Sequence, residues 1–133
     1  MKVVLDTNVL VSGVFFSGPP YQILKAWKNQ KFRMVISLEI LDEYDRVGEE
    51  LVDQFPEVDL NPVLELITTK AELIKAAPLD EAVCDDPDDD KFFACAIAGG
   101  ANLIISGDKH LLKKSGYRGV EVVRPRQFVE KYL

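Results

Sequence analysis

Two strand-like segments of the chain each end close to a carboxylate. Asp6 follows the apolar run at residues 3–5, and Asp108 follows the apolar run at residues 103–105 after a serine and a glycine. Short continuous apolar runs of this kind predict strands that are buried on both faces. Ligands of open α/β sheets bind beyond the carboxyl ends of the strands. We therefore expect Asp6 and Asp108 at one edge of a sheet, although Asp108 could serve only as the N-cap of the segment that begins at Lys109.

The densest acidic run, residues 85–90, comes just before an apolar segment that is predicted to be a buried helix. Capping and the helix dipole account for one or two aspartates at a helix start, but this run holds five in six positions. Asp90 lies three residues before Phe93, so we expect it on the inward face of the helix. Asp88 or Asp89 is expected to cap this helix. Asp89 is also the fallback for the third carboxylate, and Asp86 is a further candidate ligand outside the helix.

Glu43 is the fourth candidate, on a predicted amphipathic helix that Ser37 caps. Ile40 and Val47 belong to the buried stripe of that helix, and Glu43 falls at its border, three residues after one and four before the other. Asp42 falls almost opposite the stripe and is expected in solvent. Glu43 is therefore the acid best placed to reach from a packed helix into a cleft.

These carboxylates form a donor set made only of oxygen. Hard oxygen ligands suit Mg²⁺ or Mn²⁺ rather than zinc. One or two such ions can orient a phosphate, activate water near neutral pH and stabilise the charge that builds on a leaving oxygen. The pattern therefore predicts phosphodiester hydrolysis. We expect His110, the single histidine, to be a surface residue rather than a general base, because metal-activated water needs no imidazole.

Charge is unevenly distributed along the chain, whose net charge is −6. Residues 39–90 hold 18 acidic and 3 basic residues, whereas the two ends together hold 13 basic and 4 acidic ones. A solvated acidic surface explains most of these acids, but the asymmetry also fits a metal centre between basic segments that hold a phosphate backbone. The candidates for backbone contacts are Lys25, Lys28, Lys109, Lys113, Lys114, Arg118, Arg124 and Arg126.

Length and composition indicate one globular domain over residues 1–133, with no repeat or linker. No apolar run reaches the roughly 18 residues of a membrane span, and the two cysteines form no metal-binding or disulfide pattern. The first residues lack the anatomy of a signal peptide. We therefore expect a cytoplasmic protein that has no membrane partner.

The coarse pattern alternates strands with helices. Strands are expected at 3–5, 32–36, 71–75, 102–106 and 120–123. Helices are expected to begin at or next to Pro19, Ser37, Glu49, Asn61, Asp90, Lys109 and Pro125. Residues 76–89 form the longest expected loop. Alternation of this kind predicts a mainly parallel central sheet with helices on both faces.

These motifs, taken in order, resemble the PIN-domain family, and most of all its prokaryotic members described as toxin components of toxin–antitoxin systems. The resemblance covers nearly the whole chain and lies in the order of the motifs more than in any one of them. It is carried by Leu5-Asp6-Thr7-Asn8-Val9, by Glu43 after Ser37, by Asp86-Pro87-Asp88-Asp89-Asp90-Lys91-Phe92, by Ser106-Gly107-Asp108 with Leu111-Leu112, and by Arg124-Pro125-Arg126-Gln127-Phe128.

The resemblance implies a three-layer α/β/α sandwich and cleavage of RNA that depends on Mg²⁺ or Mn²⁺. It implies an acidic, metal-holding site made of Asp6, Glu43, Asp90 and Asp108. It also implies supporting hydrogen bonds from Thr7, Asn8 and Ser106. A homodimer or higher homo-oligomer, and a small antitoxin protein as partner, are implied in the same way.

Three other interpretations compete with this one. A haloacid-dehalogenase-like phosphatase needs a second aspartate two residues after the first, where this chain has Asn8. A phospho-receiver domain needs an acidic pair near the end of the first strand, where Asp6 stands alone. A PIN-like module that binds RNA or protein without cleavage stays open, and the presence of all four acids weighs against it.

Overall fold

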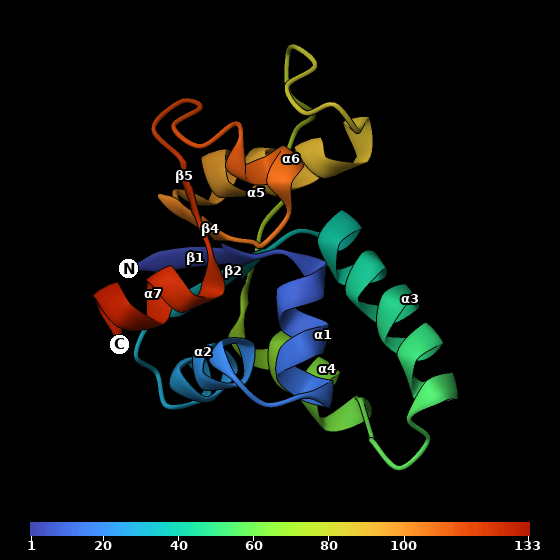
Figure 1. Cartoon of the computed structure of the whole chain (residues 1–133). Coiled ribbons are helices and arrows are strands. Elements are labelled where there is room, and N and C mark those ends of the chain that lie inside the picture. Colours follow the sequence, from blue (N-terminus) through green and yellow to red (C-terminus); the bar gives the residue numbers. More distant parts are fainter.

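The computed structural model describes all of residues 1–133 and contains one five-stranded sheet (Figure 1). The strands are β1 (Lys2–Leu5), β2 (Arg33–Ile36), β3 (Glu72–Leu73), β4 (Leu103–Ile105) and β5 (Glu121–Val123). Their order across the sheet is β3-β2-β1-β4-β5, and every neighbouring pair is parallel. The expected parallel sheet is therefore confirmed.

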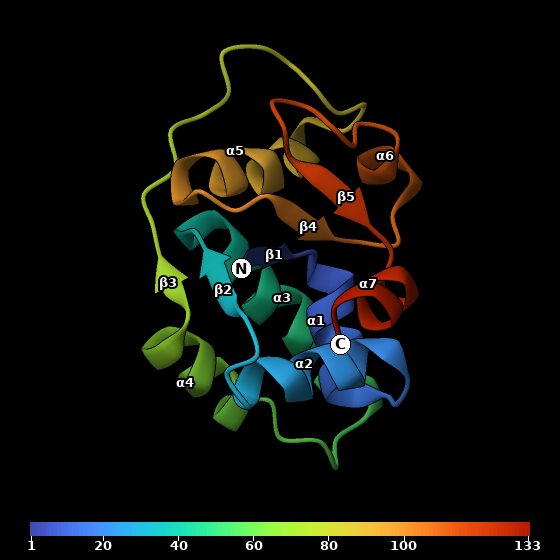
Figure 2. The same cartoon turned by 90° about the vertical axis from the view of Figure 1, so that its left-hand side faces the viewer.

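Helices cover both faces of this sheet. They are α1 (Thr7–Phe15), α2 (Pro19–Lys28), α3 (Leu38–Gln54), α4 (Asn61–Lys70), α5 (Asp90–Gly99), α6 (Lys109–Leu112) and α7 (Pro125–Tyr132), with a 3₁₀ turn, η1, over Pro87–Asp89. Two perpendicular views place α5 and α6 on one face and α1, α2, α4 and α7 on the other (Figure 1, Figure 2). The three-layer α/β/α sandwich is confirmed. None of the helices is long and apolar enough to cross a membrane.

The central strand β1 is buried on both faces. Val3, Val4 and Leu5 are each at most 1% exposed, as expected for β-branched and large apolar side chains in a covered strand. Leu5 is in register with Ile105 of β4. The residues that follow these two, Asp6 and Ser106, consequently leave the sheet side by side at its carboxyl edge.

Helix α1 begins directly after β1 and was not predicted from the sequence. Its residues are apolar on nearly every side, so they lack the 3.6-residue alternation that marks a surface helix. Gly13 lets α1 approach α2 closely, because a Cβ at this position would lie 2.8 Å from the carbonyl oxygen of Pro20. The carbonyl of Asp6 accepts hydrogen bonds from the amides of Val9 and Leu10, which fixes the turn from β1 into α1.

Helix α3 is continuous, so the separate helix expected from Glu49 is wrong. Ser37 caps α3 as predicted, since its hydroxyl accepts a hydrogen bond from the amide of Ile40. Gly48 lies at the expected break, but it is buried against Leu60, whose side chain would lie 2.3 Å from an added Cβ. The glycine therefore allows close packing and does not end the helix.

The other expected elements form with small changes of length. The strand expected at 71–75 shortens to two residues in β3, after which the amide of Ile74 still bonds to the carbonyl of Ile36. The long loop expected at 76–89 is irregular apart from η1. These differences leave the carboxyl edge of the sheet as the sequence predicts it.

Tyr44 ties α3 to the end of β1. Its side chain is fully buried, and its hydroxyl donates a hydrogen bond to the carbonyl oxygen of Leu5 over 2.5 Å. This contact holds α3, which carries Glu43, against the end of β1, directly before Asp6.

Replacing Tyr44 by phenylalanine removes the donor from a buried carbonyl. We expect the free energy of unfolding to fall by about 1 to 2 kcal/mol, measured by urea denaturation. Tyr21→Phe is the control, because Tyr21 is 47% exposed. Removal of its hydroxyl group should change the free energy of unfolding by less than about 0.5 kcal/mol. Equal stability of the two variants would contradict the role given to Tyr44.

Candidate active site

Asp6 is a buried carboxylate at the carboxyl edge of the sheet. The residue is only 6% exposed, and Ser106 donates a hydrogen bond from Oγ to Oδ2 over 2.6 Å. Burial nevertheless raises the pKa of Asp6 above its ordinary value, and the negative charges of Asp108 and Glu43 raise it further. Loss of water and nearby like charges both disfavour an ionised carboxyl group. The strand end therefore holds a carboxylate that is costly to ionise.

Ser106 also connects Asp6 to Asp108. Its Oγ accepts a hydrogen bond of 2.9 Å from the amide of Asp108, so one hydroxyl serves both acidic residues. The carboxylate of Asp108 accepts a hydrogen bond of 2.8 Å from the amide of His110 and caps α6. The capping role that the sequence left open is therefore present, and the charge of Asp108 still acts on the pKa of Asp6.

Asp89 is the member of the acidic run that shares the electrostatic environment of Asp6. Desolvation raises the pKa of Asp89 to about 6, with further contributions from the charges of Asp108, Asp86 and Asp6. Nearby negative charges raise the pKa of a carboxyl group, and the positive charge of Lys91 offsets this effect at Asp89 only in part. The structure thus brings Asp6, Asp89 and Asp108 into one group, which we call the acidic cluster.

Asp90 does not join the acidic cluster. Its two carboxylate oxygens accept hydrogen bonds from the amides of Val83 and Cys84, at 3.2 and 2.7 Å. These hydrogen bonds favour Asp89, the alternative, over Asp90 as the third carboxylate. Helical spacing from Phe93 placed Asp90 on a packed face, but that spacing does not reveal that the preceding loop uses both oxygens.

Glu43 lies at the border of α3 as expected, and other side chains engage both of its oxygens. One oxygen accepts a short hydrogen bond from the hydroxyl of Thr7. The other lies 2.7 Å from Nζ of Lys91, which is also 2.9 Å from a carboxylate oxygen of Asp88. Burial disfavours the charged ammonium, but the hydrogen bonds to Glu43 and Asp88 outweigh it and raise the pKa of Lys91.

Lys91 is a functional candidate that residue-by-residue reasoning missed. Its side chain is 14% exposed, which is unusual for a lysine, and it places a fixed positive charge next to the acidic cluster. The available signal was its position three residues after Asp88 in the first turn of a helix, where opposite charges meet. Its partner Glu43 comes from a distant segment and could not be identified by spacing.

Two further predicted site residues lie beside the cluster without supporting it by hydrogen bonds. Asn8 is exposed in the first turn of α1 and lacks the contacts that hold Thr7 and Ser106. Asp86 is exposed, and its carboxylate accepts a hydrogen bond of 3.0 Å from the amide of Asp88, which caps η1. Asp86 affects the acidic cluster only through its negative charge, which raises the pKa of Asp89.

Some basic candidates lie on the same edge of the sheet as the cluster. Lys109 and Lys114, on and after α6, form no ion pair, whereas Lys113 lies 3.3 Å from Asp85. Arg118, in contrast, precedes β5 and adjoins Gly119, which lines a hollow with Lys2 at the amino edge of the sheet; it lies 3.6 Å from Asp80. Two more candidates, Arg124 and Arg126, follow the carboxyl end of β5 at the start of α7.

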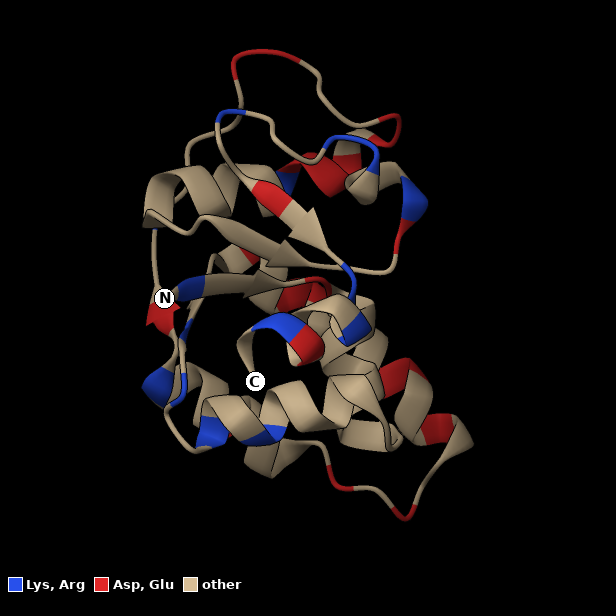
Figure 3. Ribbon diagram, turned by 60° about the vertical axis from the view of Figure 1, so that its left-hand side comes forward, with Lys and Arg blue, Asp and Glu red and all other residues tan.

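The basic residues of α2 lie elsewhere. Lys28 lines a hollow together with Arg33 and Lys70, and Arg33 opens β2 at the amino edge of the sheet. Lys25 is exposed on the same helix. Figure 3 shows acidic segments where α5 and α6 begin, and also along α3 and in the loop after it, whereas the basic segments of α2 lie well apart from the starts of α5 and α6. The structure does not bring Lys25 and Lys28 to the acidic cluster.

The acidic cluster fits a divalent cation. Burial, and then the charge of Asp108, raise the pKa of both Asp6 and Asp89, and a cation between these carboxylates would relieve the repulsion. Its donors are all oxygen, as Mg²⁺ and Mn²⁺ prefer. No three acidic, histidine or cysteine side chains already converge into a ready metal-binding group. Mg²⁺ usually keeps several waters and binds through one or two carboxylates, so the cluster suits an ion that is held partly through water.

Parallel α/β/α sandwiches with carboxylates at the carboxyl ends of their central strands form a class in which ligands bind at that edge of the sheet. Within that class, a family model described as a PIN domain matches residues 2–110. The chain therefore belongs to the PIN-domain family, and the predicted resemblance is confirmed. The fold of this family is generally that of metal-dependent nucleases, and its members typically bind divalent metals. No curated protein matches the chain.

The crowding of charge in the cluster makes a prediction about stability. The pKa of Asp89 is about 6 in the native protein, against an ordinary value of 3.8. The folded protein therefore binds this proton more tightly than the unfolded chain does. Native stability therefore falls as pH rises from about 4 to about 6, and it stays lower above that range. We expect Asp89→Asn to be more stable than the wild type at pH 7 and equal to it near pH 4, in urea unfolding with chelator present.

Asp88→Asn is the matched control for this experiment. The hydrogen bond with Lys91 lowers the pKa of Asp88, so its replacement should give no gain in stability at pH 7. If Asp89→Asn were no more stable than the wild type at pH 7, the proposed crowding of charge would be wrong.

Proposed function

We propose that the protein is a Mg²⁺- or Mn²⁺-dependent endoribonuclease that hydrolyses phosphodiester bonds at the carboxyl edge of the sheet. The observation that carries this proposal is the pair of carboxylates, Asp6 and Asp89, whose pKa is raised by burial and by the charge of Asp108, in a member of the PIN-domain family. A divalent ion bound there would activate water and stabilise the charge that develops on the phosphate and the leaving oxygen.

In this proposal Asp6, Asp89 and Asp108 hold the ion, and Ser106 orients the carboxylate of Asp6. The hydroxyl of Ser106 donates to that carboxylate and accepts from the backbone amide of Asp108, so it also fixes the backbone that carries Asp108. Groups that orient metal ligands in this way change metal affinity or activity by about 10- to 100-fold when they are removed.

We further propose that Glu43 positions Lys91 and does not contact the ion. Both oxygens of Glu43 are engaged, by Thr7 and by Lys91. An ammonium group has three donors, and Glu43 and Asp88 use two of them. The third can bind a phosphate oxygen of the RNA, which adds a fixed positive charge to the site. One ion together with Lys91 would then serve where two ions would otherwise be needed.

Basic residues on the same edge would hold the neighbouring phosphates. Lys109 and Lys114 are exposed or half-buried and outside any ion pair, and Arg124 is exposed at the end of β5. Lys113 would first have to leave its acidic partner, Asp85. Binding through such contacts weakens as salt rises.

The role of a cytoplasmic toxin with a small antitoxin partner, in a homodimer or higher oligomer, is a further proposal that rests on the resemblance of the motifs. Large apolar side chains are available on the surface for such contacts. Phe16 is 48% exposed and packs edge-on against Phe55, while Tyr21 and Leu38 are 47% and 59% exposed.

Cleavage of a labelled single-stranded RNA tests the assignment of the acids. We expect Asp6→Asn and Asp89→Asn each to lower the rate on the order of 100-fold or more, and chelator to abolish it. Asp90→Asn is the matched control, because it removes a carboxylate that faces the 83–84 loop, and most of the activity should remain. A folded Asp90→Asn variant as inactive as Asp89→Asn would show that Asp89 has been assigned wrongly. Wild-type activity in Asp6→Asn would show that cleavage does not depend on the acidic cluster, and no cleavage by the wild type would favour a module without catalysis.

Calorimetric titration with Mn²⁺ tests the role of Glu43 without RNA. We expect Asp6→Asn to weaken Mn²⁺ binding more than about 100-fold and Glu43→Gln to weaken it no more than about tenfold. Both variants should nevertheless lose cleavage, because Glu43→Gln releases Lys91. Equal losses of Mn²⁺ affinity in the two variants would mean that Glu43 is a metal ligand.

A further inference from the structure

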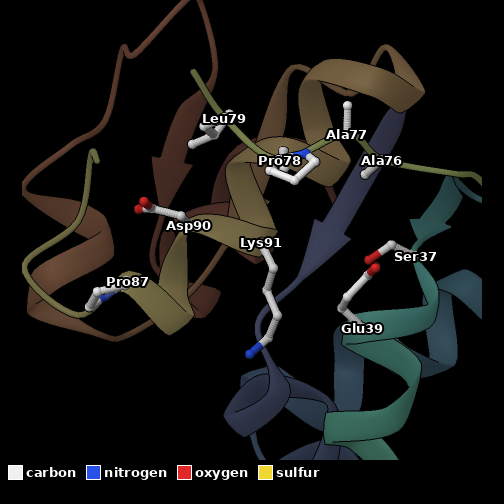
Figure 4. A pocket seen from close by; sticks show the side chains of 10 residues that line it. Ser37, Glu39, Ala76, Ala77, Pro78, Leu79, Pro87, Asp90 and Lys91 are labelled. Atoms are coloured by element: carbon white, nitrogen blue, oxygen red, sulfur yellow. The ribbon is translucent and has the colours of Figure 1, made fainter. Parts of the chain in front are cut away.

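A hollow of about 280 Å³ opens beside the acidic cluster, between the start of α3, the loop after β3 and the start of α5 (Figure 4). Its walls are largely apolar and include Ala76, Pro78, Leu79 and Ala94. The stem of Lys91 also lines the hollow, while the amine of Lys91 extends out of it toward the carboxylate of Glu43. The hollow and the acidic cluster are therefore joined by one side chain.

We propose that this hollow binds one unpaired guanine base of the RNA, next to the phosphate that is cleaved. The proposal rests on the proposed nuclease function and specifies its substrate. Pockets for drug-sized ligands and cofactors begin at about 300 Å³, so this hollow suits a single flat ring rather than a whole dinucleotide. Proteins that read RNA sequence usually place unpaired bases against apolar surfaces and read their edges.

Lys91 sets the distance between base and phosphate. Its ammonium has one donor left after Glu43 and Asp88, and we have assigned that donor to a phosphate oxygen. Its stem packs along the wall of the hollow. A nucleotide whose phosphate lies at the tip of Lys91 would therefore place its base along the stem, in the hollow.

The walls of the hollow are held in place by contacts that do not depend on RNA. The carboxylate of Asp90 binds the amides of Val83 and Cys84, which fixes the loop before α5. On the other side, the amide of Ile74 bonds to the carbonyl of Ile36 and fixes the start of the loop after β3. The hollow is thus formed before a ligand arrives.

Glu39 determines which base the hollow would select. It lines the hollow and is exposed at the start of α3. The other polar groups are engaged, since Ser37 accepts from the amide of Ile40 and Asp90 binds the loop. The free carboxylate is an acceptor only. Guanine presents two adjacent N–H donors that match its two oxygens, whereas uracil presents one N–H between two carbonyl groups that the carboxylate would repel.

Digestion of a random-sequence single-stranded RNA, followed by sequencing of the cut ends, tests the selection. We expect guanine to be enriched at one fixed position next to the cut by the wild type. Glu39→Gln should reduce that preference about tenfold, the discrimination expected from one bidentate contact. Glu49→Gln is the matched control, an exposed glutamate of the same helix that lines a different hollow, and it should leave the preference unchanged.

A binding experiment provides a readout that does not need cleavage. Guanosine 5′-monophosphate is titrated into the full chain with chelator present and followed by amide NMR signals, with uridine 5′-monophosphate as the comparison. We expect the guanosine nucleotide to shift the signals of Ala76 and Ala77, which line the hollow, and the uridine nucleotide to leave them in place. Ala76→Phe fills the hollow and should abolish the shifts while the other signals stay native.

The two experiments separate failure of this proposal from failure of the nuclease function. RNA cleavage without base preference, together with no shift at Ala76, would overturn the guanine site and leave the nuclease intact. Shifts at Ala76 without any RNA cleavage would support a guanine site in a protein that is not a nuclease. A guanine preference that survives both Glu39→Gln and Ala76→Phe would place base selection elsewhere and overturn the proposal.

Discussion

The hydrogen bond from Ser106 to Asp6 is the contact on which the acidic edge of this protein depends. Asp6 leaves the central strand of the sheet, and its charge is shielded from water by the same packing that stabilises the core. A buried carboxylate is tolerated only when it is hydrogen-bonded. Ser106 supplies that bond because β1 and β4 are in register where they end. The placement of the site thus follows from the pairing of two apolar strands.

Charge is balanced differently on the two sides of the site. On the side of α3, Glu43 and Asp88 hold the ammonium of Lys91 and their negative charge is compensated. In the acidic cluster, Asp6 and Asp89 face further carboxylates, and each has a raised pKa. At this edge of the sheet, the uncompensated negative charge therefore lies in the acidic cluster. Such a concentration of charge costs stability and suits the binding of a cation.

Much of this arrangement could be predicted from the sequence, because it follows from local patterns. The apolar runs before Asp6 and Asp108, the cap at Ser37 and the position of Glu43 at a helix border depend on spacing alone. The third carboxylate could not be settled in this way. Asp89 and Asp90 are neighbours, and the choice depends on amides of the 83–84 loop that bind Asp90. Helix α1 escaped prediction because an element that is apolar all round has no periodicity to detect.

Crystals of the protein soaked in Mn²⁺ and measured for anomalous scattering would test the central claim most directly. The account predicts one strong peak at roughly 2.0–2.2 Å from a carboxylate oxygen of Asp6, the range of small divalent ions with oxygen ligands. Asp89 or Asp108 should bind the same ion, and Lys91 should remain on Glu43. A peak bound by Glu43 and Asp90, or no peak near Asp6 at saturating Mn²⁺, would contradict the account.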